Sequence, residues 1–333
     1  MKLIGTIVVL AMLGSAPGAA ATDPQRIQSV VTFGDSWSDA GTFGTVYGTT
    51  PGSSWSQLLA RKYGDDQTAY VYVSEGKTHV LGGLNYAQGG AKTAVPAKPE
   101  GPADSIPNSA VVQVENYKRA YGRFRGDQLV VLWIGTNDIL APFASGGAFS
   151  DADVDAMNSD QAVTAAVFDA AAANVRRAVR EQINLVQAVL VNGASHLVVI
   201  NCPDMGWATF QPGTRPAGLR RATQLTSLFN TSLAAGLPHD PRVLLVDADG
   251  LLKRAAAPGA GFTHVPDDAC ANGSTVCGPT EYKERGADQT YMFAGFGHLT
   301  RHARQLLADA VGRLVDEQWS SKCQRKPTCD EGR

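Results

Sequence analysis

The feature that most constrains this chain is a short apolar run that ends abruptly in small polar residues. Val30, Val31 and Phe33 are β-branched or aromatic, so the run predicts a buried β-strand. Gly34 permits a sharp exit from that strand, and Ser36 follows at its carboxyl end, where open α/β sheets bind their ligands. A serine in this place is either a nucleophile, if a base lies near it, or the cap of the next helix.

Three later segments have polar or small residues in comparable places. Residues 84–91 contain paired glycines, which either bring backbone N–H groups close to a ligand or form an ordinary loop. Residues 129–138 read as a central parallel strand followed by Gly-Thr-Asn-Asp, where the Asn137 amide either donates to an oxyanion or makes an Asx turn or N-cap. His298 precedes the last helical stretch and is either a general base or a solvated surface histidine.

Together the four segments resemble the GDSL esterase/lipase family, also called the SGNH hydrolases, over about Gln28 to Val315. The matching blocks are Gly34–Gly41, Asn85–Ala91, Gly135–Asp138 and His298–Thr300. Each block alone is a weak signal, but four blocks in the family's order are a strong one. Two positions depart from the usual pattern, since Trp37 stands where the family has Leu and Leu299 stands where it has Pro. Neither change removes a predicted catalytic side chain.

The resemblance implies a fold and a reaction. The fold would be a three-layer α/β/α sandwich with a central, mostly parallel, five-stranded sheet of flavodoxin-like type. The reaction would be hydrolysis of an ester through an acyl-Ser36 intermediate, with His298 as general base. The oxyanion hole would consist of the N–H groups of Ser36 and Gly90 and the Asn137 amide, and no metal or other cofactor is needed.

One departure bears on the mechanism. The family normally has Asp three residues before the histidine, and here that position is Gly295. The missing carboxylate would orient the imidazole and stabilise its protonated form. Its substitute is a backbone carbonyl in the 294–297 loop, a small anion or water near His298, or an upstream acid, either Asp288 or Glu284. The remaining alternative is a weakened or inactive enzyme.

The N-terminal segment of the chain predicts an exported protein. Residues 1–21 have the form of a secretory signal peptide, with cleavage expected before Thr22, and the apolar run is too short to span a bilayer. No other segment is long and apolar enough for a membrane helix. We expect a single hydrolase domain over residues 22–320, a tail over 321–333, and a secreted or periplasmic location.

Cysteine content agrees with export, and the net charge bears on possible partners. A net charge of −2 gives no argument for nucleic acid as a partner. Cys270–Cys277 and Cys323–Cys329 are each spaced for a small disulfide ring, and Cys202 is expected to be a free, buried thiol. The spacings do not indicate a zinc site.

The remaining pattern alternates strands with helices, which predicts a parallel sheet. Strands are expected at residues 29–33, 68–72, 129–134, 196–201 and 243–247. Helices are expected over about 160–191 and 301–319, and long loops over 92–110 and 141–159. The loop 141–159 is either a wall of the substrate cleft or a disordered surface excursion, and the region 254–290 is expected to form another wall.

The substrate class is left open by the residues. A lipid, a phospholipid or another exogenous ester fits the pattern. An acyltransferase would share every catalytic residue with a hydrolase. A second alternative, which the absence of an acid at Gly295 indicates, is a non-catalytic binding protein on the same fold.

Overall fold

The centre of the fold is a parallel sheet of four strands in the order β1-β5-β6-β7. The computed structural model describes residues 26–94, 107–144, 149–160, 163–208 and 215–319. The strands of the central sheet are β1 (Ser29–Gly34), β5 (Gln128–Trp133), β6 (His196–Ile200) and β7 (Val243–Val246). Every residue of β1, β5 and β6 is buried, as expected of parallel strands covered by helices on both faces.

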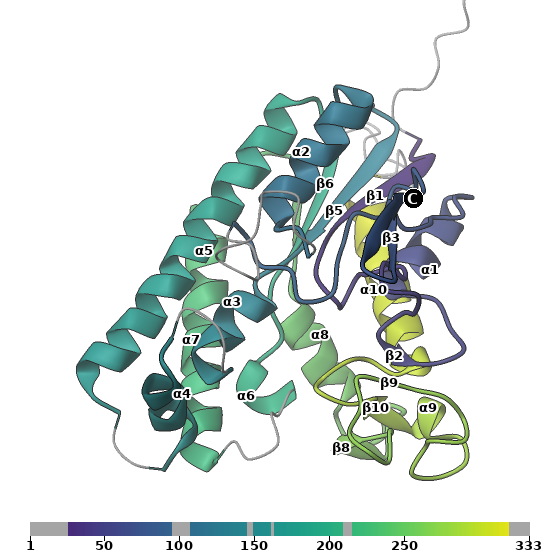
Figure 1. The fold of residues 1–333 in the computed structure, drawn as a ribbon. Helices are drawn as coiled ribbons and strands as arrows, with labels where there is room; N and C mark the ends of the chain where they lie inside the picture. Colours follow the sequence, from purple (N-terminus) through teal and green to yellow (C-terminus); the bar gives the residue numbers. More distant parts are fainter. Residues whose placement is uncertain (1–25, 95–106, 145–148, 161–162, 209–214, 320–333) are drawn as a thin grey trace, which may run out of the picture.

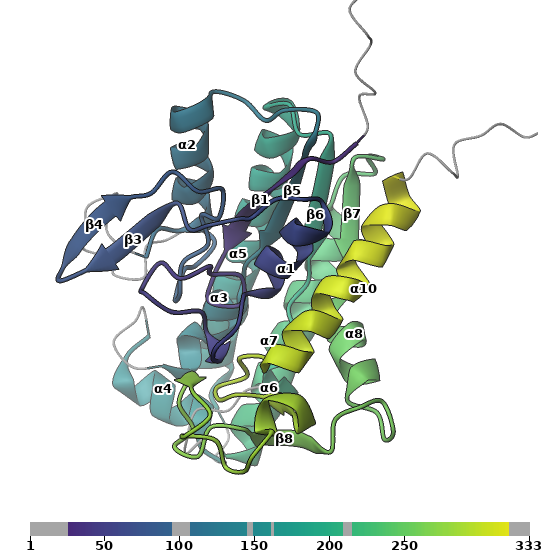
Figure 2. The same ribbon diagram turned by 90° about the vertical axis from the view of Figure 1, so that its right-hand side faces the viewer.

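Two layers of helices enclose this sheet (Figures 1 and 2), with α2, α5 and α7 on one face and α1 and α10 on the other. The helices are α1 (Trp55–Lys62), α2 (Ala110–Tyr121), α3 (Thr136–Leu140), α4 (Asp151–Asn158), α5 (Ala165–Val191), α6 (Met205–Ala208), α7 (Pro216–Gly236), α8 (Ala248–Ala255), α9 (Ala287–Thr290) and α10 (Arg301–Trp319), with one 3₁₀ turn, η1 (Ala141–Phe143). The predicted α/β/α sandwich is therefore confirmed. Among the described residues, no helix has the length and apolarity needed to cross a membrane.

The prediction of a fifth strand in the central sheet is wrong. Within the segment predicted at 68–72, Ala69 forms only an isolated parallel bridge with Asn85. The end of the segment enters an antiparallel hairpin of β3 (Val71–Ser74) and β4 (Lys77–Val80), which projects from the side of the molecule (Figure 2). The place beside β1 is taken by residues 84–86, which bond to Thr32 on both sides but pair only as an isolated bridge. The bridge is too short to count as a strand because the chain turns away at once into the paired glycines.

Two further pairs of short strands lie near the carboxyl edge of the sheet. They are β2 (Gly48–Thr49) with β9 (Val276–Cys277), and β8 (His264–Asp268) with β10 (Tyr291–Phe293). A disulfide joins Cys270 to Cys277, as predicted, and Cys202 is buried without a disulfide partner among the described residues. The predicted signal peptide and the Cys323–Cys329 pair lie outside the described residues.

Helix boundaries match the sequence pattern unevenly. The last helix covers the predicted residues 301–319, whereas α5 begins at Ala165, capped by the Thr164 hydroxyl, instead of near residue 160. The expected loop 141–159 is wrong in part, because it contains η1 and α4. Ser150 starts α4 with a capping box, a local signal that its many small and acidic neighbours obscured.

Candidate active site

Ser36 lies directly after β1, at the carboxyl edge of the central sheet. Both backbone groups of Gly34 are fixed by the Gln113 side chain, at 2.8 Å each. A Cβ at Gly34 would collide with the carbonyl oxygen of Trp133, so only glycine lets β1 leave the sheet so close to β5. The turn leaves Ser36 partly exposed between buried neighbours, in the place a nucleophile requires.

His298 reaches Ser36 from the far end of the sequence. Its Nε2 lies 2.9 Å from Ser36 Oγ, and its Nδ1 lies 3.1 Å from the carbonyl oxygen of Gly295. A carbonyl only accepts, so Nδ1 carries the proton and Nε2 accepts the hydroxyl hydrogen of Ser36. This tautomer is the one a general base needs, and it is held here by a backbone oxygen instead of a carboxylate.

The position of the absent acid is not an empty space. A Cβ added at Gly295 would collide with the Ser274 carbonyl oxygen and lie 2.7 Å from that of Gly273. Both oxygens belong to the loop closed by the Cys270–Cys277 disulfide. The chain therefore places backbone where relatives of this sequence pattern place an aspartate side chain.

The two upstream acids have other partners. Asp288 Oδ2 lies 2.8 Å from a terminal guanidinium nitrogen of Arg301 and also accepts from its Nε. Glu284 Oε1 lies 3.4 Å from His264 Nε2. Neither carboxylate is hydrogen-bonded to His298, whose Nδ1 bonds to the Gly295 carbonyl oxygen.

The three expected oxyanion donors have unused hydrogen-bonding capacity in the described part of the chain. Within the described part of the chain, the N–H groups of Ser36 and Gly90 donate to no protein acceptor. The neighbouring Gly89 N–H is taken by Asp39, which leaves Gly90 as the free donor of the pair. Asn137 gives one amide hydrogen to the Ala91 carbonyl at 2.9 Å and keeps the second.

Ser36 and Asn137, but not Gly90, line a cavity of about 190 Å³. Its lining consists of Ser36, Trp37, Thr136, Asn137, Leu140, Thr275, Phe296 and His298. Thr275 comes from the region 254–290, in agreement with the expected wall, whereas none of the described residues in 141–159 lines the cavity. Phe296 is a lining residue that sequence reasoning missed. Its φ of +49° is unusual for a bulky side chain, and the flanking Gly295 and Gly297 were the available signal.

The model of the GDSL-like lipase/acylhydrolase family matches residues 30–311. The chain belongs to this family. As a member of this family, the chain is a carboxylic ester hydrolase. Among solved structures, phospholipase A1 from Streptomyces albidoflavus NA297 is similar over 88% of this chain and 100% of that chain, with 16% identity and a TM-score of 0.45. The chain matches none of the curated proteins compared with it.

Buried polar side chains tie the sequence blocks of this GDSL-like chain together. Asp39 accepts from the Gly89 N–H at 2.8 Å, and Asp138 accepts from the Thr93 N–H and hydroxyl at 2.9 Å each. Asn85 donates to the Ser38 carbonyl at 2.9 Å. Burial raises the pKa of both aspartates, while their hydrogen bonds oppose the rise. The contacts of Asp39 and Asn85 fix the glycine segment 85–91 relative to the serine segment 34–41.

The electrostatics of the site favour a neutral imidazole. Burial, assisted by the charge of Arg304, lowers the pKa of His298 to about 4, although the Gly295 carbonyl acts in the opposite direction. Burial likewise raises the pKa of Asp35, next to the serine, to about 7. His298 is therefore unprotonated and able to accept a proton over the ordinary working range of pH.

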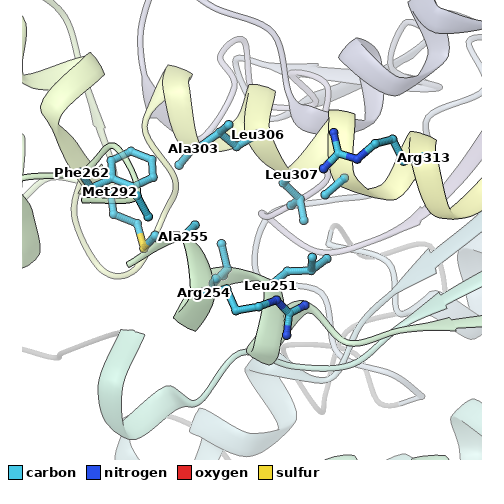
Figure 3. A pocket seen from close by; sticks show the side chains of 12 residues that line it. Leu251, Arg254, Ala255, Phe262, Met292, Ala303, Leu306, Leu307 and Arg313 are labelled. Carbon is cyan, nitrogen blue, oxygen red and sulfur yellow. The ribbon is translucent and has the colours of Figure 1, made fainter. Parts of the chain in front are cut away.

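A larger cavity, of about 310 Å³, lies away from this chemistry, between α8 and α10 (Figure 3). Its wall is mostly apolar, with Arg254 and Arg313 among the lining residues. It contains none of the predicted catalytic residues. In the described ranges, no group of three or more His, Cys, Asp or Glu side chains is placed to hold a metal ion.

Proposed function

We propose that the protein is a secreted serine ester hydrolase in which Ser36 is the nucleophile and His298 the general base. The observation that carries this proposal is the 2.9 Å contact between His298 Nε2 and Ser36 Oγ. A neutral base within hydrogen-bonding distance of a hydroxyl is the arrangement that nucleophilic acyl transfer requires. The family match over residues 30–311 gives this pair its reaction class.

The reaction divides into two halves. Ser36 Oγ attacks the ester carbonyl carbon, and the hydroxyl proton passes to His298 Nε2. The attack converts the substrate carbonyl into a tetrahedral oxyanion. The oxyanion collapses, His298 returns the proton to the leaving alcohol, and the acyl group stays on Ser36. Water then repeats the sequence, with His298 taking its proton, and releases the acid.

The proposed oxyanion donors act mainly in the transition state. The N–H groups of Ser36 and Gly90 are backbone donors and need no reorientation when charge develops. The Ala91 carbonyl aligns the Asn137 amide by accepting one of its hydrogens. Loss of one such donor typically removes roughly 3 kcal/mol of transition-state stabilisation.

The acyl part of the substrate is proposed to lie in the cavity beside Ser36. Trp37, Leu140 and Phe296 give this cavity apolar walls, which suits a hydrocarbon chain. We therefore favour a lipid, phospholipid or other apolar ester as the substrate. The signal-peptide pattern of residues 1–21 and the Cys270–Cys277 disulfide support a substrate met outside the cytoplasm.

The test is a screen of short- and long-chain aryl esters and phospholipids against the native protein, Ser36→Ala and the control Ser227→Ala. Ser227 is exposed on α7 and does not line the cavity beside Ser36, so its replacement removes a serine hydroxyl outside the proposed site. Hydrolysis by the native protein and the control, and none by Ser36→Ala, supports the proposal. Equal turnover by Ser36→Ala contradicts it.

Two additions separate the alternatives that share this fold. An alcohol acceptor added to the assay distinguishes an acyltransferase, because the acyl group would then appear as a new ester and not as free acid. A serine-directed organophosphate distinguishes a non-catalytic binding protein, because only an activated Ser36 is labelled.

A further inference from the structure

Two aromatic rings lie nearly parallel to the imidazole of the proposed base. The ring centroid of Tyr47 is 5.1 Å from that of His298, with 24° between the planes. The Trp37 ring is 6.4 Å away, at 30°. Trp37 is a position where the family pattern has leucine, and Gly295 is the position where it has aspartate. Two departures from the pattern thus meet at one histidine.

We propose that Tyr47, assisted by Trp37, is a positioning residue that takes over part of the role of the absent carboxylate. Its ring face fixes the plane of the His298 imidazole and stabilises the imidazolium that forms when His298 accepts the Ser36 proton. This inference rests on the proposed function, because it concerns the protonation step of that reaction.

The Tyr47 ring is held firmly in this place. Its backbone carbonyl accepts from Arg304 Nη1 at 3.1 Å, and Arg304 is almost completely buried. The Tyr47 ring also packs against Gly89, because a Cβ added at Gly89 would lie only 2.6 Å from Tyr47 Cε2. The ring therefore contacts the glycine block that supplies an oxyanion donor as well as the imidazole, and it cannot move without disturbing one of them.

The physical effect is directed at the transition state. An aromatic face carries partial negative charge and attracts a cation within about 6 Å of its centroid. Tyr47 meets this distance, whereas Trp37 at 6.4 Å contributes mainly by packing. The neutral imidazole of the resting enzyme gains less from the ring than the imidazolium does. An interaction of this kind raises kcat and leaves KM nearly unchanged.

The decisive experiment varies the charge of the ring face and not its size. Tyr47 is replaced first by Phe and then by mono-, di- and trifluorinated phenylalanine, because each fluorine withdraws electrons from the ring. We expect Tyr47→Phe to retain most of the kcat and the fluorinated series to fall step by step. Tyr47→Leu, which lacks the ring altogether, should lose about 2- to 30-fold in kcat at constant KM.

The controls separate a ring effect from a general loss of structure. Tyr121→Leu removes a tyrosine of 45% exposure from the surface of α2 and should leave kcat unchanged. Trp37→Leu should have a smaller effect than Tyr47→Leu, because of its greater distance. If Tyr47→Leu does not fold, the fluorinated series still decides, since its side chains keep the shape of phenylalanine.

Each outcome has one reading. A flat fluorinated series, with Ser36→Ala inactive, overturns this inference and leaves the proposed function standing. A rise in KM without a change in kcat also overturns it, because Tyr47 would then only contact substrate. Full turnover by Ser36→Ala overturns both proposals together.

Discussion

Restoring the family's aspartate at position 295 separates two explanations for its absence. If the acid is merely missing, Gly295→Asp should return a carboxylate to His298 and raise activity. The structure predicts the reverse, because the Cβ of any side chain at 295 would meet the backbone carbonyls of Gly273 and Ser274. Those carbonyls lie in a loop that the Cys270–Cys277 disulfide keeps from retreating.

The magnitude follows from the clash. Forcing extra atoms into a packed site typically destabilises by about 1–3 kcal/mol. A shift of roughly 2–4 °C in Tm accompanies each kcal/mol in domains of moderate size, so Gly295→Asp should melt about 2–12 °C lower. Gly295→Ala carries the same Cβ without a carboxylate and should show most of this loss. Because the Gly295 backbone also holds His298 Nδ1, both variants should have reduced kcat.

The assay is thermal unfolding together with steady-state hydrolysis of an aryl ester. Gly126→Ala is the matched control, since a Cβ there makes only an ordinary contact of 3.7 Å with Ser195 Oγ. A Gly295→Asp protein with native Tm and a higher kcat would refute the reasoning. It would mean that the 270–277 loop moves aside and that the site accepts a third catalytic group.

Three further predictions concern single groups of the site. The acid limb of kcat/KM should titrate near pH 4, since His298 must be neutral to act as a base and its pKa is lowered to about 4; a limb at pH 6–7 would contradict the burial argument. Asn137→Ala should lower kcat by roughly 10²–10³ in steady-state kinetics at nearly constant KM, whereas a pure KM effect would make Asn137 a substrate-binding residue. Asp288→Ala should lower kcat less than about tenfold, well short of the roughly 10⁴ expected for a true triad acid, because its carboxylate is paired with Arg301; a loss as large as that of His298→Ala would make Asp288 the displaced acid.

The fold was largely predictable because its strands are strong local signals. The runs at β1, β5 and β6 are short, apolar and β-branched, and each lies within one residue of its predicted start. The error at 68–72 has a tertiary cause. Whether a β-prone segment joins the main sheet depends on which other segment occupies the edge, and here residues 84–86 lie beside β1.

The site was predictable to the extent that sheet topology determines it. Ser36 and Asn137 follow adjacent parallel strands, so their approach could be expected from sequence order alone. The group that fills the space at Gly295 could not be predicted, because it belongs to the loop 270–277, which is remote from Gly295 in sequence and is closed by a disulfide. Tyr47 was missed for a similar reason, since its role depends on stacking across the site and no local motif marks it.

The most direct test of the central claim is to trap the acyl-enzyme. The protein is mixed with a p-nitrophenyl ester, quenched in acid during turnover and mapped by peptide mass spectrometry. The account predicts an acyl group on the peptide that contains Ser36, and no adduct on the Ser36→Ala protein. Acylation of a different residue, or continued turnover by Ser36→Ala, would contradict the assignment of Ser36 and His298 as the reacting pair.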